Sequence, residues 1–134
     1  MTPEARFSAR VKAGLVNCAI ERIENRVNLG VPDMMIGIGD SFVLVELKVV
    51  AKGQQVKLRP HQIAFMTRHA AKGRPCFVLV FDMGNTQRPS TIRLYHGRDA
   101  MELSTQGLKL QHLRCWPSRG MPWAELEETL GLVK

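Results

Sequence analysis

The sequence predicts an α/β fold in which helices flank a mixed β-sheet. Two segments rich in Val, Leu and Phe, Phe42–Val50 and Cys76–Phe81, are typical of central strands. The segment between them, Pro60–Lys72, is a predicted helix because it begins with proline and is followed by Gly73. A helical crossover between two strands implies that they are parallel. The 134 residues, 45% of them hydrophobic, suffice for one domain spanning 1–134.

A predicted hairpin brings charged residues together at the start of this sheet. Asp33–Ile38 is a predicted strand, and a Gly-Asp turn signal separates it from Phe42–Val50, so Asp33 approaches Glu46. Glu46 and Lys48 share one face of their strand because side chains alternate along it. Charged side chains in a central strand are costly unless they are paired or bind a metal. The hairpin therefore predicts two carboxylates and an ammonium group at one spot, enough to hold Mg²⁺ and an attacking water.

The N-terminal segment Ala5–Asn28 is predicted to be one amphipathic helix, with an apolar stripe formed by Val16, Ile20, Ile23 and Val27. Glu24 falls within this stripe, whereas Glu21 lies on a more polar face. A carboxylate in an apolar stripe requires a reason, so Glu24 is the candidate third acid beside Asp33 and Glu46. A boundary glutamate that extends to water is the alternative interpretation.

The remaining segments are expected to complete the sheet and its cover. Thr91–His96 alternates as an outer strand, and a short helix is predicted after Pro122 and before Gly131. Apolar residues of the C-terminal third either fill the core or form an interface, and core packing is the preferred interpretation. These residues are Leu108, Leu110, Leu113, Trp116, Trp123, Leu126 and Leu130.

Positive charge is concentrated directly after the predicted carboxylate pair. The net charge is +7, and residues 49–81 contain six Lys or Arg residues but no Asp or Glu. A surface of one sign favours a polyanion as partner, although basic residues that only solubilise a surface are the alternative. Ala51–Leu58 is predicted to be an exposed loop that reaches a ligand. The predicted DNA-binding residues are Lys52, Lys57, Arg59, His61, Arg68 and Lys72.

The composition argues against several other classes of protein. No apolar run approaches the roughly 18 residues of a membrane span, and the N-terminus lacks the apolar segment of a signal peptide, so a cytoplasmic protein is expected. Cys18, Cys76 and Cys115 are odd in number and too far apart for a zinc knuckle or a redox pair. The four histidines also lack the spacing of metal ligands.

Pro32-Asp33 followed by Glu46-Leu47-Lys48 resembles the motif of the PD-(D/E)XK nuclease superfamily. With Glu24 before the motif and Gln62 after it, the arrangement resembles the virus-type replication-repair nuclease (VRR-NUC) branch and the related archaeal Holliday-junction resolvases. The resemblance covers roughly Glu21 to Val80. It implies a restriction-endonuclease-like core with the element order αβββαβ.

The resemblance also implies a Mg²⁺-dependent endonuclease, a deoxyribonuclease that hydrolyses DNA phosphodiester bonds, with Mn²⁺ as a substitute ion. Lys48 is expected to orient or help deprotonate the attacking water, and Gln62 to orient water or phosphate. The implied metal ligands are Asp33, Glu46, Glu24 and the backbone carbonyl of Leu47.

Branched DNA or a Holliday junction is the expected substrate. Two opposed cuts in a junction require two active centres, which predicts a homodimer. A phage or prophage origin fits a small nuclease by analogy. The alternatives are a nucleic-acid-binding module without activity or with weak activity, and a nicking or restriction-like nuclease without junction preference.

Overall fold

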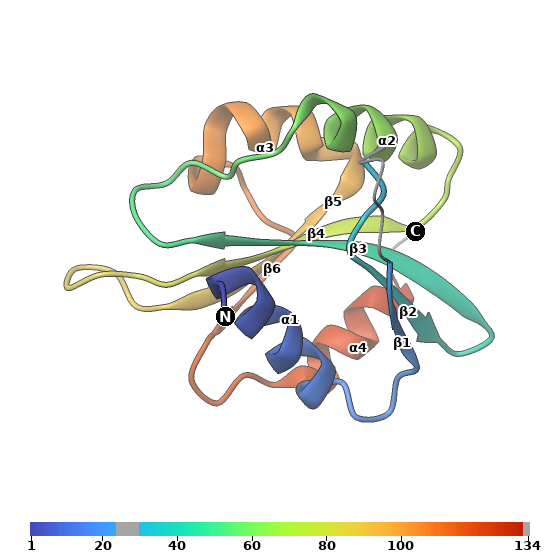
Figure 1. Cartoon of the computed structure of the whole chain (residues 1–134), viewed down its shortest axis with the longest axis horizontal. Helices are drawn as coiled ribbons and strands as arrows, with labels where there is room; N and C mark the ends of the chain where they lie inside the picture. Colours follow the sequence, from blue (N-terminus) through green and yellow to red (C-terminus); the bar gives the residue numbers. More distant parts are fainter. Residues whose placement is uncertain (24–29, 133–134) are drawn as a thin grey trace.

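The computed structural model of the chain describes residues 1–23 and 30–132 (Figure 1). Within them, six strands form one sheet in the order β1-β2-β3-β4-β5-β6. The strands are β1 (Ile20–Arg22), β2 (Met34–Ile38), β3 (Ser41–Val50), β4 (Cys76–Asp82), β5 (Thr91–His96) and β6 (Arg114–Pro117). β3 and β4 are parallel, and every other neighbouring pair is antiparallel. The mixed sheet and the parallel pair at its centre confirm the predicted fold class.

Helices cover both faces of the sheet (Figure 1). On one face lie α2 (Pro60–Ala71) and α3 (Ala100–Gln106), and on the other lie α1 (Pro3–Gly14) and α4 (Trp123–Leu132). Short 3-10 turns, η1 (Gly97–Asp99) and η2 (Gly107–Lys109), flank α3. In the described part of the chain, no helix combines the length and the apolar character needed to cross a membrane.

The two faces of β3 contribute to two separate cores. Val45 and Leu47 are buried with residues of α1 and α4, whereas Val50 is buried with residues of α2 and α3. Glu46 and Lys48 alternate with Val45 and Leu47, so they project from the face that α2 covers. The predicted alternation is confirmed, and it directs both charged side chains of the motif toward the start of α2.

The N-terminal helix is shorter than the sequence pattern predicted. α1 ends at Gly14, and β1 then pairs with β2 at the edge of the sheet. The prediction of one helix over Ala5–Asn28 is therefore wrong from Leu15 to Ile23. Its last residues, 24–28, lie outside the described residues.

Tertiary contacts override the helical periodicity in this segment. A Cβ atom on Gly14 would lie 2.2 Å from the indole ring of Trp123, so the end of α1 packs directly against α4. The chain that follows adds a strand to the open edge of β2, where β-branched Ile20 fits a pleated surface. The N–H of Gly37 donates a hydrogen bond to the carbonyl of Ala19 at 2.8 Å, which extends this pairing.

The C-terminal third packs inside the described structure, as preferred from the sequence. Leu108, Trp116, Leu126 and Leu130 are all buried, and Leu126 is 0% exposed. The half-buried residues of the set pack against the same two cores: Leu110, Leu113 and Trp123. These side chains are therefore not spare surface for a second copy of the chain. α4 continues to Leu132, slightly beyond its predicted end.

The basic loop between β3 and α2 is anchored at its centre. The N–H of Leu108 donates to the carbonyl of Gln54 at 2.8 Å, and the guanidinium of Arg88 donates to the carbonyl of Gly53 at 3.1 Å. Val56 is 1% exposed, while most other side chains of the loop are exposed. The loop is exposed as predicted. Because its backbone is anchored at Gly53 and Gln54, the Cα positions of its basic residues are held in place.

Candidate active site

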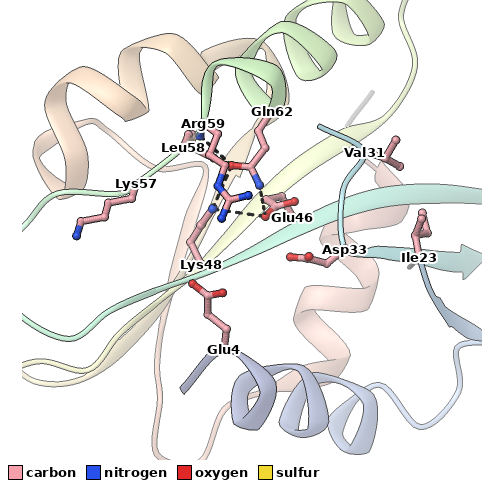
Figure 2. A pocket seen from close by; sticks show the side chains of 10 residues that line it. All are labelled: Glu4, Ile23, Val31, Asp33, Glu46, Lys48, Lys57, Leu58, Arg59 and Gln62. Carbon is pink, nitrogen blue, oxygen red and sulfur yellow. Dashed lines mark hydrogen bonds and ion pairs between the residues drawn. The ribbon is translucent and has the colours of Figure 1, made fainter. Parts of the chain in front are cut away.

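An open pocket of about 550 Å³ lies where β3 passes the start of α2 (Figure 2). Its lining consists of Glu4, Ile23, Val31, Asp33, Glu46, Lys48, Lys57, Leu58, Arg59 and Gln62. The four predicted catalytic residues that the structure describes, Asp33, Glu46, Lys48 and Gln62, all reach this one pocket. They come from β3, from α2 and from the residue that precedes β2.

Asp33 takes the place of a strand beside β3. The pairing of β2 with β3 begins at Met34, which lies opposite Val45, so no described strand covers that edge of β3 beyond Val45. There the carboxylate of Asp33 accepts a hydrogen bond from the N–H of Leu47 at 2.9 Å. The N–H and C=O of a strand residue point to the same edge, so the carbonyl of Leu47 faces the Asp33 side as well.

Gln62 connects the glutamate and the lysine of the motif (Figure 2). Its amide nitrogen donates to Glu46 at 3.1 Å, and its amide oxygen accepts from Lys48 Nζ at 3.1 Å. The same oxygen accepts from the backbone N–H of Arg59 at 2.9 Å, which fixes the amide at the first turn of α2. Lys48 Nζ also lies 3.6 Å from a carboxylate oxygen of Glu46. One amide thus holds both charged groups in position.

The environment of Glu46 favours a bound cation. Glu46 is only 3% exposed, and burial, together with the neighbouring carboxylate of Asp33, raises its pKa to about 8 despite the lowering effect of Lys48. A proton or a cation relieves the repulsion between two such carboxylates. Carboxylate and carbonyl oxygens are the hard ligands that Mg²⁺ and Mn²⁺ prefer. Asp33, Glu46 and the carbonyl of Leu47 therefore fit a divalent cation.

This donor set is sparse in the described residues. Across 1–23 and 30–132, no three His, Cys, Asp or Glu side chains are close enough to hold a metal ion together. Two carboxylates and one carbonyl suit Mg²⁺, which retains several waters and often takes further ligands from substrate phosphates. Glu24, the predicted third acid, lies outside the described residues.

Glu4 is a pocket residue that the sequence reasoning missed. It lies in the first turn of α1, and its carboxylate points into the pocket near Lys48 (Figure 2). A signal for it exists in the sequence, because Glu4 shares the i, i+3, i+4, i+7 pattern with Phe7, Ser8 and Val11, which are all buried. The prediction of one long helix over Ala5–Asn28 selected Glu24 instead.

The predicted DNA-binding residues extend from the pocket along α2. Lys57 and Arg59 line the pocket itself. The other four are exposed and lie outside its lining: Lys52 on the basic loop, and His61, Arg68 and Lys72 along α2 and at its end. The six residues thus lie at the pocket, on the basic loop, along α2 and at the end of this helix.

Gly30 fixes the chain before Asp33 against the start of α2. Its φ is +78°, and a Cβ atom there would lie 2.1 Å from the carbonyl oxygen of His61. We predict that Gly30→Ala lowers the free energy of unfolding by about 2–4 kcal/mol, because left-handed strain and a backbone clash add. Gly39→Ala is the control, since its φ is +60° with nothing within 4 Å. Urea denaturation should show a smaller loss of about 1 kcal/mol there, and equal losses would contradict the assigned contact.

The raised pKa of Glu46 predicts a pH-dependent affinity for divalent cations. Below about pH 8 the carboxyl group is protonated, and a cation must displace that proton. Affinity should therefore rise as much as tenfold per pH unit up to about pH 8 and level off above it. Calorimetric titration with Mn²⁺ at several pH values measures this. Glu46→Gln should remove the pH dependence of the Mn²⁺ affinity. A parent chain whose Mn²⁺ affinity is the same at every pH would contradict the prediction.

Comparison with a solved structure supports the restriction-endonuclease-like class of α/β folds that the sequence predicted. A solved structure similar to the chain is Hjc, a Holliday junction resolvase from the archaeal hyperthermophile Archaeoglobus fulgidus. The TM-score is 0.55 at 15% sequence identity, over 93% of this chain and 98% of Hjc. No family model and no curated protein matches the chain. The similarity establishes the fold, while the VRR-NUC branch stays a prediction.

Proposed function

We propose that the chain is a metal-dependent deoxyribonuclease that hydrolyses phosphodiester bonds, with Mg²⁺ as its ion and Mn²⁺ as a substitute. The observation that carries this proposal is the convergence of Asp33, Glu46 and Lys48 in one pocket, where Gln62 joins the acid to the lysine. The basic residues beside the pocket suit a polyanionic substrate. The similarity in fold to a Holliday junction resolvase supports the same class of chemistry.

Each residue of the pocket has a distinct task in this proposal. Asp33, Glu46 and the carbonyl of Leu47 would hold the cation. A bound divalent cation would polarise the phosphate and lower the pKa of an attacking water. Lys48 lies beside Glu46 and would stabilise the negative charge that develops on the phosphate. Gln62 keeps the Lys48 ammonium aimed into the pocket.

We further propose branched DNA, including four-way junctions, as the preferred substrate, and a homodimer as the active form. The similarity in fold to Hjc, which is a Holliday junction resolvase, supports the substrate. The dimer follows from the need for two opposed cuts, because the described residues of one chain supply one such pocket. Its contact surface must involve residues other than the buried Trp116, Leu126 and Leu130.

A panel of DNA substrates tests this proposal. Linear duplex, flap, fork and four-way junction are incubated with the chain in Mg²⁺, in Mn²⁺ and in EDTA. We expect cleavage only with a divalent cation and fastest cleavage of the branched substrates. Binding without cleavage on every substrate would instead identify a nucleic-acid-binding module. Equal rates on linear and branched DNA would remove the branched preference and leave the nuclease assignment standing.

The basic residues at the pocket predict the salt dependence of DNA binding. Reversing the charge of Lys57 and Arg59 together should weaken binding to any sequence, and it should reduce the slope of log K against log salt by about 0.9 for each phosphate that is no longer neutralised. Fluorescence anisotropy of labelled duplex in EDTA measures the slope. Lys12→Glu, at an exposed position in the last turn of α1, is the control and should leave the slope unchanged. A slope unaffected by the double reversal would place the binding surface elsewhere.

A further inference from the structure

α2 and the turn that follows it carry an aromatic–cation cluster, composed of Phe65, Arg68, His69, Lys72 and Arg74, in which the two rings are half-buried and the three cations are exposed. The rings of Phe65 and His69 have centroids 4.2 Å apart and an interplanar angle of 38°. The guanidinium of Arg68 lies 5.7 Å from the centre of the Phe65 ring, and that of Arg74 lies 3.0 Å from His69 Nδ1. The cluster is therefore a chain of contacts in space, from the Arg68 guanidinium to the Phe65 ring, the His69 imidazole and the Arg74 guanidinium.

The cluster continues the candidate active site along α2. Phe65 and His69 follow Gln62 by three and seven residues, so the three side chains lie on one side of the helix. At about 1.5 Å of rise per residue, they lie about 4.5 and 10 Å from Gln62 along the helix axis. One strand of stacked DNA advances about 3.4 Å per nucleotide. A strand that leaves the pocket along α2 would meet the cluster within a few nucleotides of the cut.

The positive charges of the cluster have no acidic partner among the described residues. Arg68, Lys72 and Arg74 are exposed, and none of them forms an ion pair with a described carboxylate. Burial and the nearby charges of Arg74 and Arg68 lower the pKa of His69, which favours a neutral ring suited to stacking. Cations near a helix C-terminus complement the helix dipole, which explains part of the charge. The interaction with the helix dipole does not, however, require the aromatic rings of Phe65 and His69 between these cations.

We propose that the aromatic–cation cluster binds an unpaired stretch of a nucleic-acid strand beside the candidate active site. Unpaired bases stack on aromatic rings and on guanidinium planes, and the flanking phosphates pair with the cations. Paired bases are enclosed in the duplex and offer this surface only their phosphates. The inference rests on the proposed function and deepens it, because a flap or an opened branch point supplies an unpaired strand next to a duplex.

Three phenylalanine variants test the inference by binding measurements in EDTA. The probe is a short single strand that carries a fluorescent adenine analogue, compared with a blunt duplex. Phe65→Leu should weaken single-strand binding by about tenfold or more, since it removes the aromatic ring on which a base stacks, and leave duplex binding unchanged. Phe65→Trp retains an aromatic face and should restore the affinity. Phe42→Leu is the matched control, because Phe42 is an exposed phenylalanine on β3, near the turn between β2 and β3.

Two outcomes would overturn the inference. Phe65→Leu could bind the single strand as tightly as the parent chain, which would mean that no base stacks there. It could instead weaken single-strand and duplex binding equally. The cluster would then bind the phosphates of any DNA, or Phe65 would only support the fold, and no base would stack there. Because binding is measured without a metal, these outcomes are independent of cleavage. A parent chain that cuts DNA while Phe65→Leu binds normally would leave the proposed nuclease intact.

Discussion

Asp33→Asn or Glu46→Gln should reduce DNA cleavage by about a thousandfold or more, because each removes a cation ligand worth several kcal/mol in the transition state. Both amides keep an oxygen that can accept the present hydrogen bonds, from the Leu47 N–H in one case and from the Gln62 amide in the other. The pocket should therefore keep its shape. Without a metal and below about pH 8, Glu46→Gln should leave DNA binding constant, because the Glu46 carboxyl group is already protonated. Asp33→Asn should leave DNA binding constant or tighten it, since a negative charge near the phosphate is gone.

Asp40→Asn is the matched control for this prediction. Asp40 lies on the same hairpin as Asp33, in the exposed turn between β2 and β3, and does not line the pocket. Initial rates on a labelled branched substrate in Mg²⁺ compare the variants, and thermal melting shows that each one is folded. A folded Asp33→Asn or Glu46→Gln variant that cuts at the parent rate would show that the ligands are assigned wrongly.

Asp82→Ala should lower the free energy of unfolding by about 3–5 kcal/mol, the usual cost of breaking a buried ion pair from one side. Asp82 is 0% exposed and accepts hydrogen bonds from Arg88 at 2.8 and 3.0 Å and from the Gly84 N–H at 3.0 Å. Arg93 lies 3.5 Å away as a second cation. The loss is a large share of the roughly 5–15 kcal/mol that stabilises a typical domain. It should also loosen the basic loop, which Arg88 holds through the carbonyl of Gly53.

An exposed ion pair provides the comparison for Asp82. Arg114 and Glu125 are 3.1 Å apart, and their side chains are 46% and 51% exposed. Arg114→Ala should therefore cost no more than about 1 kcal/mol. Urea unfolding of both variants measures the difference. If Asp82→Ala were as mild as Arg114→Ala, the buried pair would not be what fixes the loop against the sheet.

The hairpin that carries the motif could be predicted from sequence because its determinants are local. Short runs of apolar residues define β2 and β3, and the turn between them contains Gly39 with a φ of +60°. Once the hairpin forms, Met34 lies opposite Val45, and Asp33 therefore lies beside Glu46. The helix between β3 and β4 was equally predictable, because Pro60 and Gly73 mark its ends within a residue or two.

Features that depend on contacts distant in sequence could not be predicted in the same way. The end of α1 depends on the ring of Trp123, more than a hundred residues later, and its periodicity alone predicted a longer helix. Glu4 was not predicted as a pocket residue for the same reason. It reaches the pocket because α1 packs against β3. The fixed course of the basic loop depends on Arg88 and Leu108, which no local pattern links to it.

A divalent cation held by Asp33 and Glu46 is the centre of the proposed mechanism, and a Mn²⁺ titration followed by electron paramagnetic resonance tests it most directly. The parent chain and Asp40→Asn should show the same saturable binding, and DNA cleavage should saturate over the same range of Mn²⁺ concentration. The double variant Asp33→Asn with Glu46→Gln should lose both. Unchanged Mn²⁺ binding in a folded double variant, or cleavage by the parent chain in EDTA, would contradict a metal-dependent nuclease at this site.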